Sequence, residues 1–288
     1  MVDIREKLKE IKVLPTFPSI VQGVIEVLED PKSSARDLAK RMDASMTSEV
    51  LRIANSAYYG TRSFRTIDSI EHAIAIIGFQ SLFSIVLQMP FLRMVVGEET
   101  GFDEKEYLRH TLLTAAISKT LSRSLKLGEP SALYISGIMH DVGKIVICSF
   151  FKEEWKDILR LKTENKLPAY LVEREILGVD HGYVGGAILD EWNIPEIIVE
   201  SVMFHHTPEE AQNHVDGAQC VYFANAIAKA VEELITDEKE ESLKDRMRKK
   251  IFESVDLETA RKILSSDTED ELFVTILETK FLMRSLDR

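Results

Sequence analysis

The sequence predicts an all-α protein built from helices that are joined by short turns. Apolar residues recur at helical spacing along most of the 288-residue chain, and no convincing run of alternating apolar and polar residues marks a half-buried strand. Hydrophobic residues make up 45% of the chain and charged residues 29%, an ordinary balance for a globular protein with a large core. We therefore expect helices packed on helices, without a β-sheet.

The first ~95 residues predict one compact unit of short helices, the usual product of closely spaced caps and breakers. An apolar-periodic segment at 20–30 stops before a proline, and Ser34 is a suitable N-cap for the helix that follows. The next helix is expected to end at Gly60, and another should run from Ser69 to Gly78.

An uncharged stretch from Ala73 to Leu92 is long enough to cross a membrane. Gly78, several polar side chains and Pro90 interrupt it, which favours two buried core helices over a membrane span. The N-terminus is charged from its third residue and lacks an apolar signal core, so we expect a cytoplasmic protein with no membrane partner.

The polar, glycine-containing stretch 96–103 predicts an internal boundary, followed by longer helices. We divide the chain into an N-terminal helical subdomain at 1–99, a second helical subdomain at 100–235 and a C-terminal helical extension at 236–288. The charges of both signs at 232–250 indicate a solvated helix or a loose connection. The helices expected beyond the boundary are 104–126, 131–150, 153–165, 168–177, 181–192, 195–206, 215–235, 256–264 and 268–286.

The chain is acidic, with 48 acidic against 36 basic residues and a net charge of −12. That balance argues against nucleic acid as a partner, since such binding depends on neutralising phosphates. Cys148 and Cys220 both lie in apolar stretches and are expected to be buried free thiols of a reducing compartment.

Five of the seven histidines predict a shared polar site. His110 lies on an amphipathic helix, while His140 and Asp141 are adjacent within what reads as a buried helix. His181 begins a glycine-containing helix, and two further histidines end the helix that starts at Pro195. Burying such groups costs several kcal/mol unless they find partners. The candidate donors are therefore His110, His140, Asp141, His181, His205 and His206.

Helices that each supply one or two imidazoles or carboxylates can surround a cation. Imidazole suits iron, manganese, zinc, cobalt or nickel, so we expect a divalent transition metal. Lys144 follows Asp141 by three residues, near the same face, where a phosphate-holding cation would lie. The alternative is a core of hydrogen-bonded histidines without any ligand. We assign His72 and His214 no role in the site.

The order of these residues resembles the HD superfamily of metal-dependent phosphohydrolases. The strings "LPTFPSIVQGVIEVLEDP", "ANSAYYG" and "DHGYVGGAILDEW" resemble one branch of it, the bacterial HDOD domain, over about 8–230. The resemblance implies an HD-domain-like helical bundle with an N-terminal helical subdomain. It places the metal ligands on the six candidate donors, with Glu106 as a weaker addition and Lys144 as a phosphate contact.

Two departures from the HD pattern bear on activity, and a third difference, from the HDOD pattern, removes only a rigid turn residue. Asn225 stands where the last aspartate ligand is expected, and an amide oxygen is a neutral, weaker ligand. The Gly-Tyr-Pro string of the cyclic-dinucleotide phosphodiesterases does not follow the paired histidines. Ala44 replaces a proline that is more usual in HDOD domains.

Two functions remain open on this evidence. HDOD domains are generally regarded as regulatory modules, so the first is a bacterial signal-transduction module that binds protein partners, or a small ligand, without effective hydrolysis. The second is a metal-dependent phosphohydrolase that acts on a nucleotide or phosphoester, with Lys144 holding the phosphate.

Overall fold

A computed structural model describes residues 21–23, 25–27, 32, 34–42, 46–48, 50–51, 67–92, 94, 100–236 and 243–286. Within these ranges every regular element is a helix and no strand occurs, which confirms the all-α prediction. The labelled α-helices are α3 (Ala35–Lys40), α5 (Ile70–Ile77), α6 (Phe79–Leu92), α7 (Glu104–Leu125), α8 (Pro130–Met139), α9 (Val142–Phe150), α10 (Lys152–Asn165), α11 (Ala169–Leu177), α12 (His181–Glu191), α13 (Glu196–Met203), α14 (Val215–Thr236), α15 (Leu243–Ser254), α16 (Leu257–Ile263) and α17 (Ser266–Leu286).

Local signals set the N-terminal helices as the sequence predicted. The Asp37 carboxylate accepts hydrogen bonds from the Ser34 N–H at 3.1 Å and from its hydroxyl at 2.7 Å, which fixes the start of α3. Gly78, at φ +82°, separates α5 from α6. The uncharged stretch therefore forms two core helices, as expected. Gly60, Ala44 and the stretch 95–99 lie outside the described residues.

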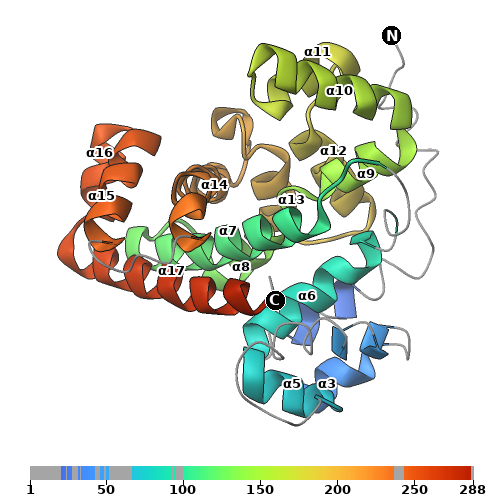
Figure 1. Ribbon diagram of the computed structural model, residues 1–288, viewed down its shortest axis with the longest axis vertical. Coiled ribbons are helices and arrows are strands. Elements are labelled where there is room, and N and C mark those ends of the chain that lie inside the picture. The colour runs from blue at the N-terminus through green and yellow to red at the C-terminus, as the bar shows by residue number, and fades with distance from the viewer. Residues whose placement is uncertain are drawn as a thin grey trace.

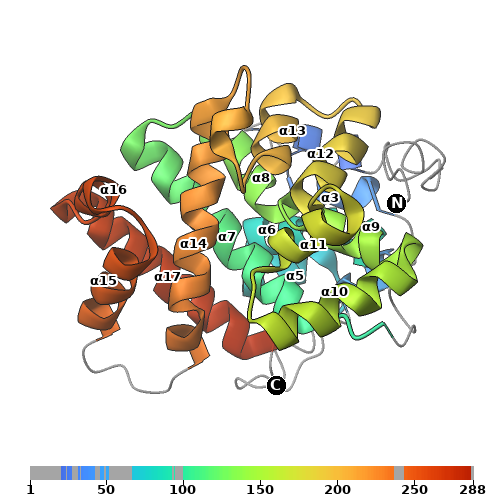
Figure 2. The same cartoon turned by 90° about the horizontal axis from the view of Figure 1, so that it is seen from above.

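The long helix α7 lies at the centre of the molecule. In Figure 1, α3, α5 and α6 lie below one end of α7, α15 and α16 lie near its other end, and α17 runs alongside it. Figure 2 shows α14 running beside α7. One buried apolar cluster joins the N-terminal helices to α8, α9, α12 and α13, and a second joins α7 to α14, α15 and α17. Because α7 contributes to both, it connects the two cores.

The helix predicted at 131–150 is two helices. α8 ends at Met139 and α9 begins at Val142, with His140 and Asp141 in the turn between them. Because both helices are buried, their apolar pattern continues across the break and hides it. Pro130–Phe150 is the one described stretch long and apolar enough to cross a membrane, and 83% of its most apolar window is buried inside the protein.

The structure corrects two further predictions. The helix expected at 195–206 ends at Met203, so His205 and His206 lie in the turn after α13. The charged segment near residue 243 contains α15, which buries Leu243, Met247 and Ile251. These apolar residues recur every four positions, but their charged neighbours obscure the pattern in the sequence.

Candidate metal centre

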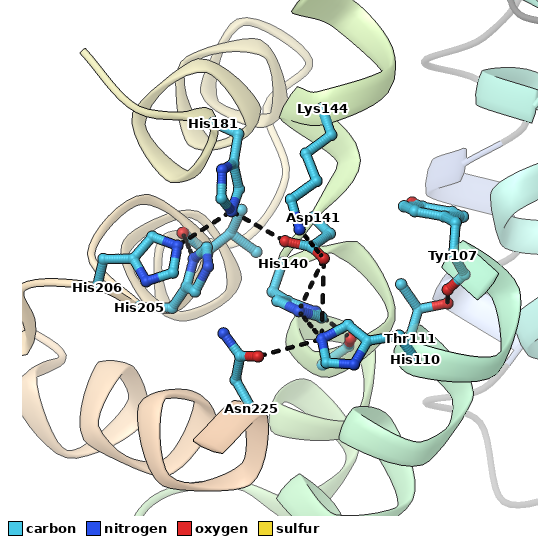
Figure 3. A network of polar contacts seen from close by, with 12 residues as sticks. Tyr107, His110, Thr111, His140, Asp141, Lys144, His181, His205, His206 and Asn225 are labelled. Carbon is cyan, nitrogen blue, oxygen red and sulfur yellow. Dashed lines mark hydrogen bonds and ion pairs between the residues drawn. The ribbon is translucent and has the colours of Figure 1, made fainter. Parts of the chain in front are cut away.

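The predicted donors come from four parts of the fold and meet in one cavity (Figure 3). α7 supplies His110, and the turn between α8 and α9 supplies His140 and Asp141. His181 is the first residue of α12, where the side chain of Asp180 caps the helix by accepting from the Tyr183 N–H. His205 and His206 complete the set from the turn after α13. Helix ends and turns, rather than helix faces, therefore present most of the donors.

The first group of donor atoms is His110, His140 and Asp141. The Nε2 atoms of the two histidines lie 3.3 Å apart, and Asp141 Oδ2 lies 3.4 Å from His140 Nε2 and 3.8 Å from His110 Nε2. Asn225 joins this group from α14, with its Oδ1 3.1 Å from His110 Nε2. All four residues are buried.

The second group consists of His181, His205 and His206. His181 Nε2 lies 3.0 Å from His206 Nε2, and the ring centroids of His205 and His206 are 3.9 Å apart. Asp141 links the two groups, because its Oδ1 lies 2.9 Å from His181 Nε2. The ring of Tyr170 stacks on His206 at 4.2 Å and covers the partly exposed side of this group.

Three of the imidazoles are held by the nitrogen that faces away from the cavity. His140 Nδ1 lies 2.8 Å from the Gly137 carbonyl and His205 Nδ1 lies 2.7 Å from the Val202 carbonyl. A carbonyl oxygen only accepts, so each Nδ1 carries the proton and each Nε2 offers a lone pair. His181 Nδ1 similarly donates to Glu173 at 2.6 Å. This is the outer-shell arrangement that orients metal-binding histidines.

The pKa of His181 shifts in the opposite direction from those of the other histidines of the site. Burial lowers the pKa of His110 and of His140 to about 3, so both are neutral at pH 7. Burial, reinforced by its histidine neighbours, also lowers the pKa of His205. Burial opposes the charged form of His181, but the Glu173 carboxylate outweighs it and raises the pKa. A metal would therefore compete with a proton more strongly at His181 than at the other histidines, which it would bind as neutral ligands.

One buried donor atom tests whether the site fits a metal. His205 Nε2 is shielded from solvent and has no hydrogen-bond partner among the described residues. Leaving such an atom unpaired costs about 1–3 kcal/mol. A cation placed among the inward-facing Nε2 atoms would satisfy it, so the donor set fits a divalent transition metal.

The other residues expected at the site are placed differently. Lys144 lies beside the first group, with its Nζ 2.6 Å from Asp141 Oδ2. Glu106 is exposed near the start of α7 and belongs to neither group of donors. His72 and His214 lie elsewhere, within ion-pair distance of Asp68 and Glu196.

Sequence reasoning missed three charged residues around the cavity. Glu173 is fully buried on α11 and accepts from both the His181 backbone N–H and its ring. Lys229 and Glu232 follow Asn225 by one and two turns of α14, and Glu232 Oε2 lies 3.9 Å from His110 Nδ1. The i, i+4 and i+7 spacing of Asn225 and these two residues places them on one face of α14, and this could have been recognised in the sequence. Glu173 has no such signal, because it meets His181 only through the loop that precedes α12.

Comparison with known proteins identifies the family. The HDOD domain model matches residues 14–208, so the chain belongs to the HDOD domain family. An uncharacterized protein of Treponema pallidum is 23% identical over 218 residues, which cover 74% of this chain and 41% of that protein. This chain thus spans about two fifths of the length of that relative.

Solved structures share the fold. A proposed phosphohydrolase from Shewanella amazonensis matches with a TM-score of 0.67 at 21% identity, covering 99% of this chain and 98% of that one. An HDOD domain protein with unknown function from Geobacter sulfurreducens gives 0.63 at 22%, covering 98% and 96%. A proposed signal transduction protein from Marinobacter aquaeolei gives 0.63 at 14%, covering 100% and 62%. Identities this low support a common helical fold and leave function to the site.

Proposed function

We propose that this protein is a signal-transduction module whose cavity holds a divalent transition metal without supporting effective hydrolysis. It would act by binding a protein partner, or a small ligand, through the N-terminal helices and the adjoining cavity. The observation that carries the proposal is Asn225. Its amide oxygen lies 3.1 Å from His110 Nε2, at the place where a second carboxylate would complete the first donor group.

The charge available to metal ions supports this proposal. Asp141 is the one carboxylate among the two donor groups. The buried carboxylate of Glu173 is engaged with His181 rather than directed at the centre. Two divalent ions would bring four positive charges against one carboxylate and a neutral amide. Two-metal hydrolysis needs both ions held at a fixed separation, so this donor set favours weaker or single occupancy.

The bound metal would be iron, manganese, zinc, cobalt or nickel, the ions that imidazole-rich sites prefer. His110, His140, Asp141 and His181 would hold it with one or both of the remaining histidines. The ion would supply a Lewis acid. Lys144 is placed beside Asp141 and would add a positive charge next to a bound anion.

A phosphohydrolase is the competing function, and the inward-facing Nε2 atoms together with Lys144 favour it. The experiment that separates the two uses purified protein reloaded with manganese or iron. Cyclic dinucleotides, nucleoside phosphates and bis(p-nitrophenyl) phosphate serve as substrates. We expect no turnover above that of the His140→Ala/Asp141→Ala double variant. Turnover that the double variant lacks would overturn the proposal in favour of the enzyme.

A further inference from the structure

His110 differs from the other buried histidines of the cavity in what surrounds its two ring nitrogens. His140 and His205 each donate from Nδ1 to a backbone carbonyl, and His181 donates from Nδ1 to a buried carboxylate. Among the described residues, His110 Nδ1 makes no such hydrogen bond. The Glu232 carboxylate approaches it from α14, but its Oε2 is 3.9 Å away, beyond hydrogen-bond range. His110 therefore lacks the outer contact that fixes the tautomer of the other three.

The contacts on the cavity side place the proton of His110 on Nε2. Three acceptors face this nitrogen, which are His140 Nε2 at 3.3 Å, Asn225 Oδ1 at 3.1 Å and Asp141 Oδ2 at 3.8 Å (Figure 3). The His140 proton is on Nδ1, so its Nε2 is bare. Two bare nitrogens at this separation would repel each other, whereas an N–H on His110 pairs with both His140 and Asn225. Because the His110 ring is neutral, its Nδ1 is then bare.

This tautomer of His110 does not suit a metal ligand. A histidine binds a metal through a nitrogen that carries no proton, and the nitrogen of His110 that faces the cavity carries one. Nε2 becomes available only if it loses this proton and Nδ1 gains one, which keeps the ring neutral. The new N–H at Nδ1 then needs an acceptor, which metal-bound histidines find in a carboxylate, a carbonyl or water.

The Glu232 carboxylate is placed to be that acceptor. Its Oε2 needs to move by only about 1 Å to come within hydrogen-bond distance of His110 Nδ1. The Glu232 side chain is not enclosed by packing, because 31% of it is exposed. As the contact stands, it is open, and the His110 ring is held from the cavity side alone.

We propose that His110 changes tautomer when the first donor group takes up a metal, and that Glu232 is the positioning residue that stabilises the metal-binding form. The Nε2 proton leaves to water and a proton from water adds to Nδ1, so the ring gains no net charge. Glu232 then accepts from Nδ1, and the lone pair of Nε2 joins the oxygen of Asn225 as a donor. Metal loading of the first group is thereby controlled from outside the donor set. The inference rests on the proposed metal binding by the cavity.

The NMR shifts of the ring nitrogens report the tautomer directly. Long-range proton–nitrogen correlation spectra would be recorded on histidine-labelled protein, first after chelator treatment and then with zinc, which is diamagnetic. His110→Gln assigns the His110 signals. In chelator-treated wild type we expect the proton of His110 on Nε2 and that of His140 on Nδ1. With zinc, the His110 proton should be on Nδ1. A proton on His110 Nδ1 before zinc is added would overturn the inference.

The zinc affinity of Glu232 variants tests the acceptor. Competition with a chromophoric chelator would compare wild type with Glu232→Met, which removes the acceptor, and with Glu232→Gln, which keeps an acceptor oxygen without the charge. We expect Glu232→Met to bind zinc about 10–100-fold more weakly, the usual effect of losing an outer-shell partner. Glu232→Gln should lie between Glu232→Met and wild type, and its zinc form should still carry the His110 proton on Nδ1. Glu253→Met, at an exposed position on α15, is the matched control and should bind zinc like wild type.

The outcomes distinguish a failure of the tautomer change from a failure of the proposed function. Equal zinc affinity in Glu232→Met and Glu253→Met would overturn the role of Glu232. Zinc binding by wild type without a change at His110 would overturn the tautomer change and leave the metal site standing. A wild type that binds neither zinc nor manganese would overturn the proposed function and this inference with it. If thermal unfolding shows that Glu232→Met does not fold, Glu232→Gln decides, and a zinc affinity equal to that of wild type contradicts the inference.

Discussion

The two donor groups of the cavity contain similar residues but are held in different ways. In the first group, two neutral histidines face Asp141 and the amide of Asn225, and all four are buried. The second group has three imidazoles, one of them partly exposed, and no carboxylate of its own. The carboxylate that acts on this group is Glu173, which contacts the outward-facing nitrogen of His181 and is not itself a donor. The first group is therefore governed by its direct ligands and the second by an outer carboxylate.

Because of this difference, a change of charge should act on the metal directly in the first group and through His181 in the second. A change at Asn225 alters the negative charge that the metal meets directly, whereas a change at Glu173 alters the orientation and proton affinity of His181. Asp141 belongs to both, since one of its oxygens faces each group. Close backbone packing between α9 and α12 keeps the groups at this separation.

Gly143→Ala should have the largest effect, because it forces the two groups apart. A Cβ at Gly143 would lie 1.9 Å from the His181 carbonyl oxygen and 2.8 Å from the Gly185 backbone nitrogen. We expect a loss of unfolding free energy of about 4 kcal/mol or more, measured by urea denaturation. Gly23→Ala, which meets only the flexible Arg41 side chain, is the control. Equal stability of the two variants would refute the close approach of α9 and α12.

Glu173→Gln should weaken the second group next. The substitution removes the carboxylate that raises the pKa of His181 and fixes its Nδ1 proton. We expect metal affinity to fall by about 10–100-fold, the usual cost of losing an outer-shell partner. Competition with a chromophoric chelator measures it. Glu175→Gln, at an exposed site on the same helix, should bind metal like wild type. Unchanged affinity in Glu173→Gln would show that Glu173 does not support the ligand.

The stability of chelator-treated protein should respond to pH with opposite signs at His181 and at the buried neutral histidines of the first group. His110 and His140 have folded pKa values of about 3, below the usual histidine value of 6.5, so the unfolded chain takes up protons first. Unfolding free energy should fall as pH drops from about 6.5 toward 3, by roughly 1 kcal/mol per unit for each group. His181 has a raised folded pKa. Its contribution to the unfolding free energy is therefore fully present below about pH 6.5 and is lost as the pH rises through the folded pKa.

Variants assign each limb of this pH profile. His140→Gln should flatten the acid limb of chemical denaturation curves recorded between pH 4 and 8, and Glu173→Gln should flatten the alkaline limb. An acid limb that is as steep in His140→Gln as in wild type would contradict the buried neutral state of this histidine.

Asn225→Asp should have the smallest effect, confined to the first group. The added carboxylate faces His110 and supplies a negative charge that the amide lacks. We expect metal affinity to rise about tenfold, or about 1.4 kcal/mol, in manganese titrations. Asn165→Asp, at an exposed position on α10, controls for the change in net charge. If both variants bind manganese equally, the missing carboxylate does not limit the site.

Much of the helical frame and the donor set could be predicted from local patterns. Ser34 begins one helix and Gly78 ends another by short-range geometry, which depends on residues a few positions away. The histidines signalled a shared site because polar groups in apolar helices need partners. The break at His140 and Asp141 was missed, since burial of both flanking helices gives one continuous apolar pattern.

The sequence by itself determined that the chain is helical and which histidines and carboxylate require a common partner. Helical periodicity and burial costs are properties of each segment, so they can be read before the chain folds. Only the tertiary structure decided that Glu173 holds His181, that Asn225 faces His110 and that the Tyr107 hydroxyl is left without a partner. These contacts join residues on different helices, and their geometry depends on how the helices pack.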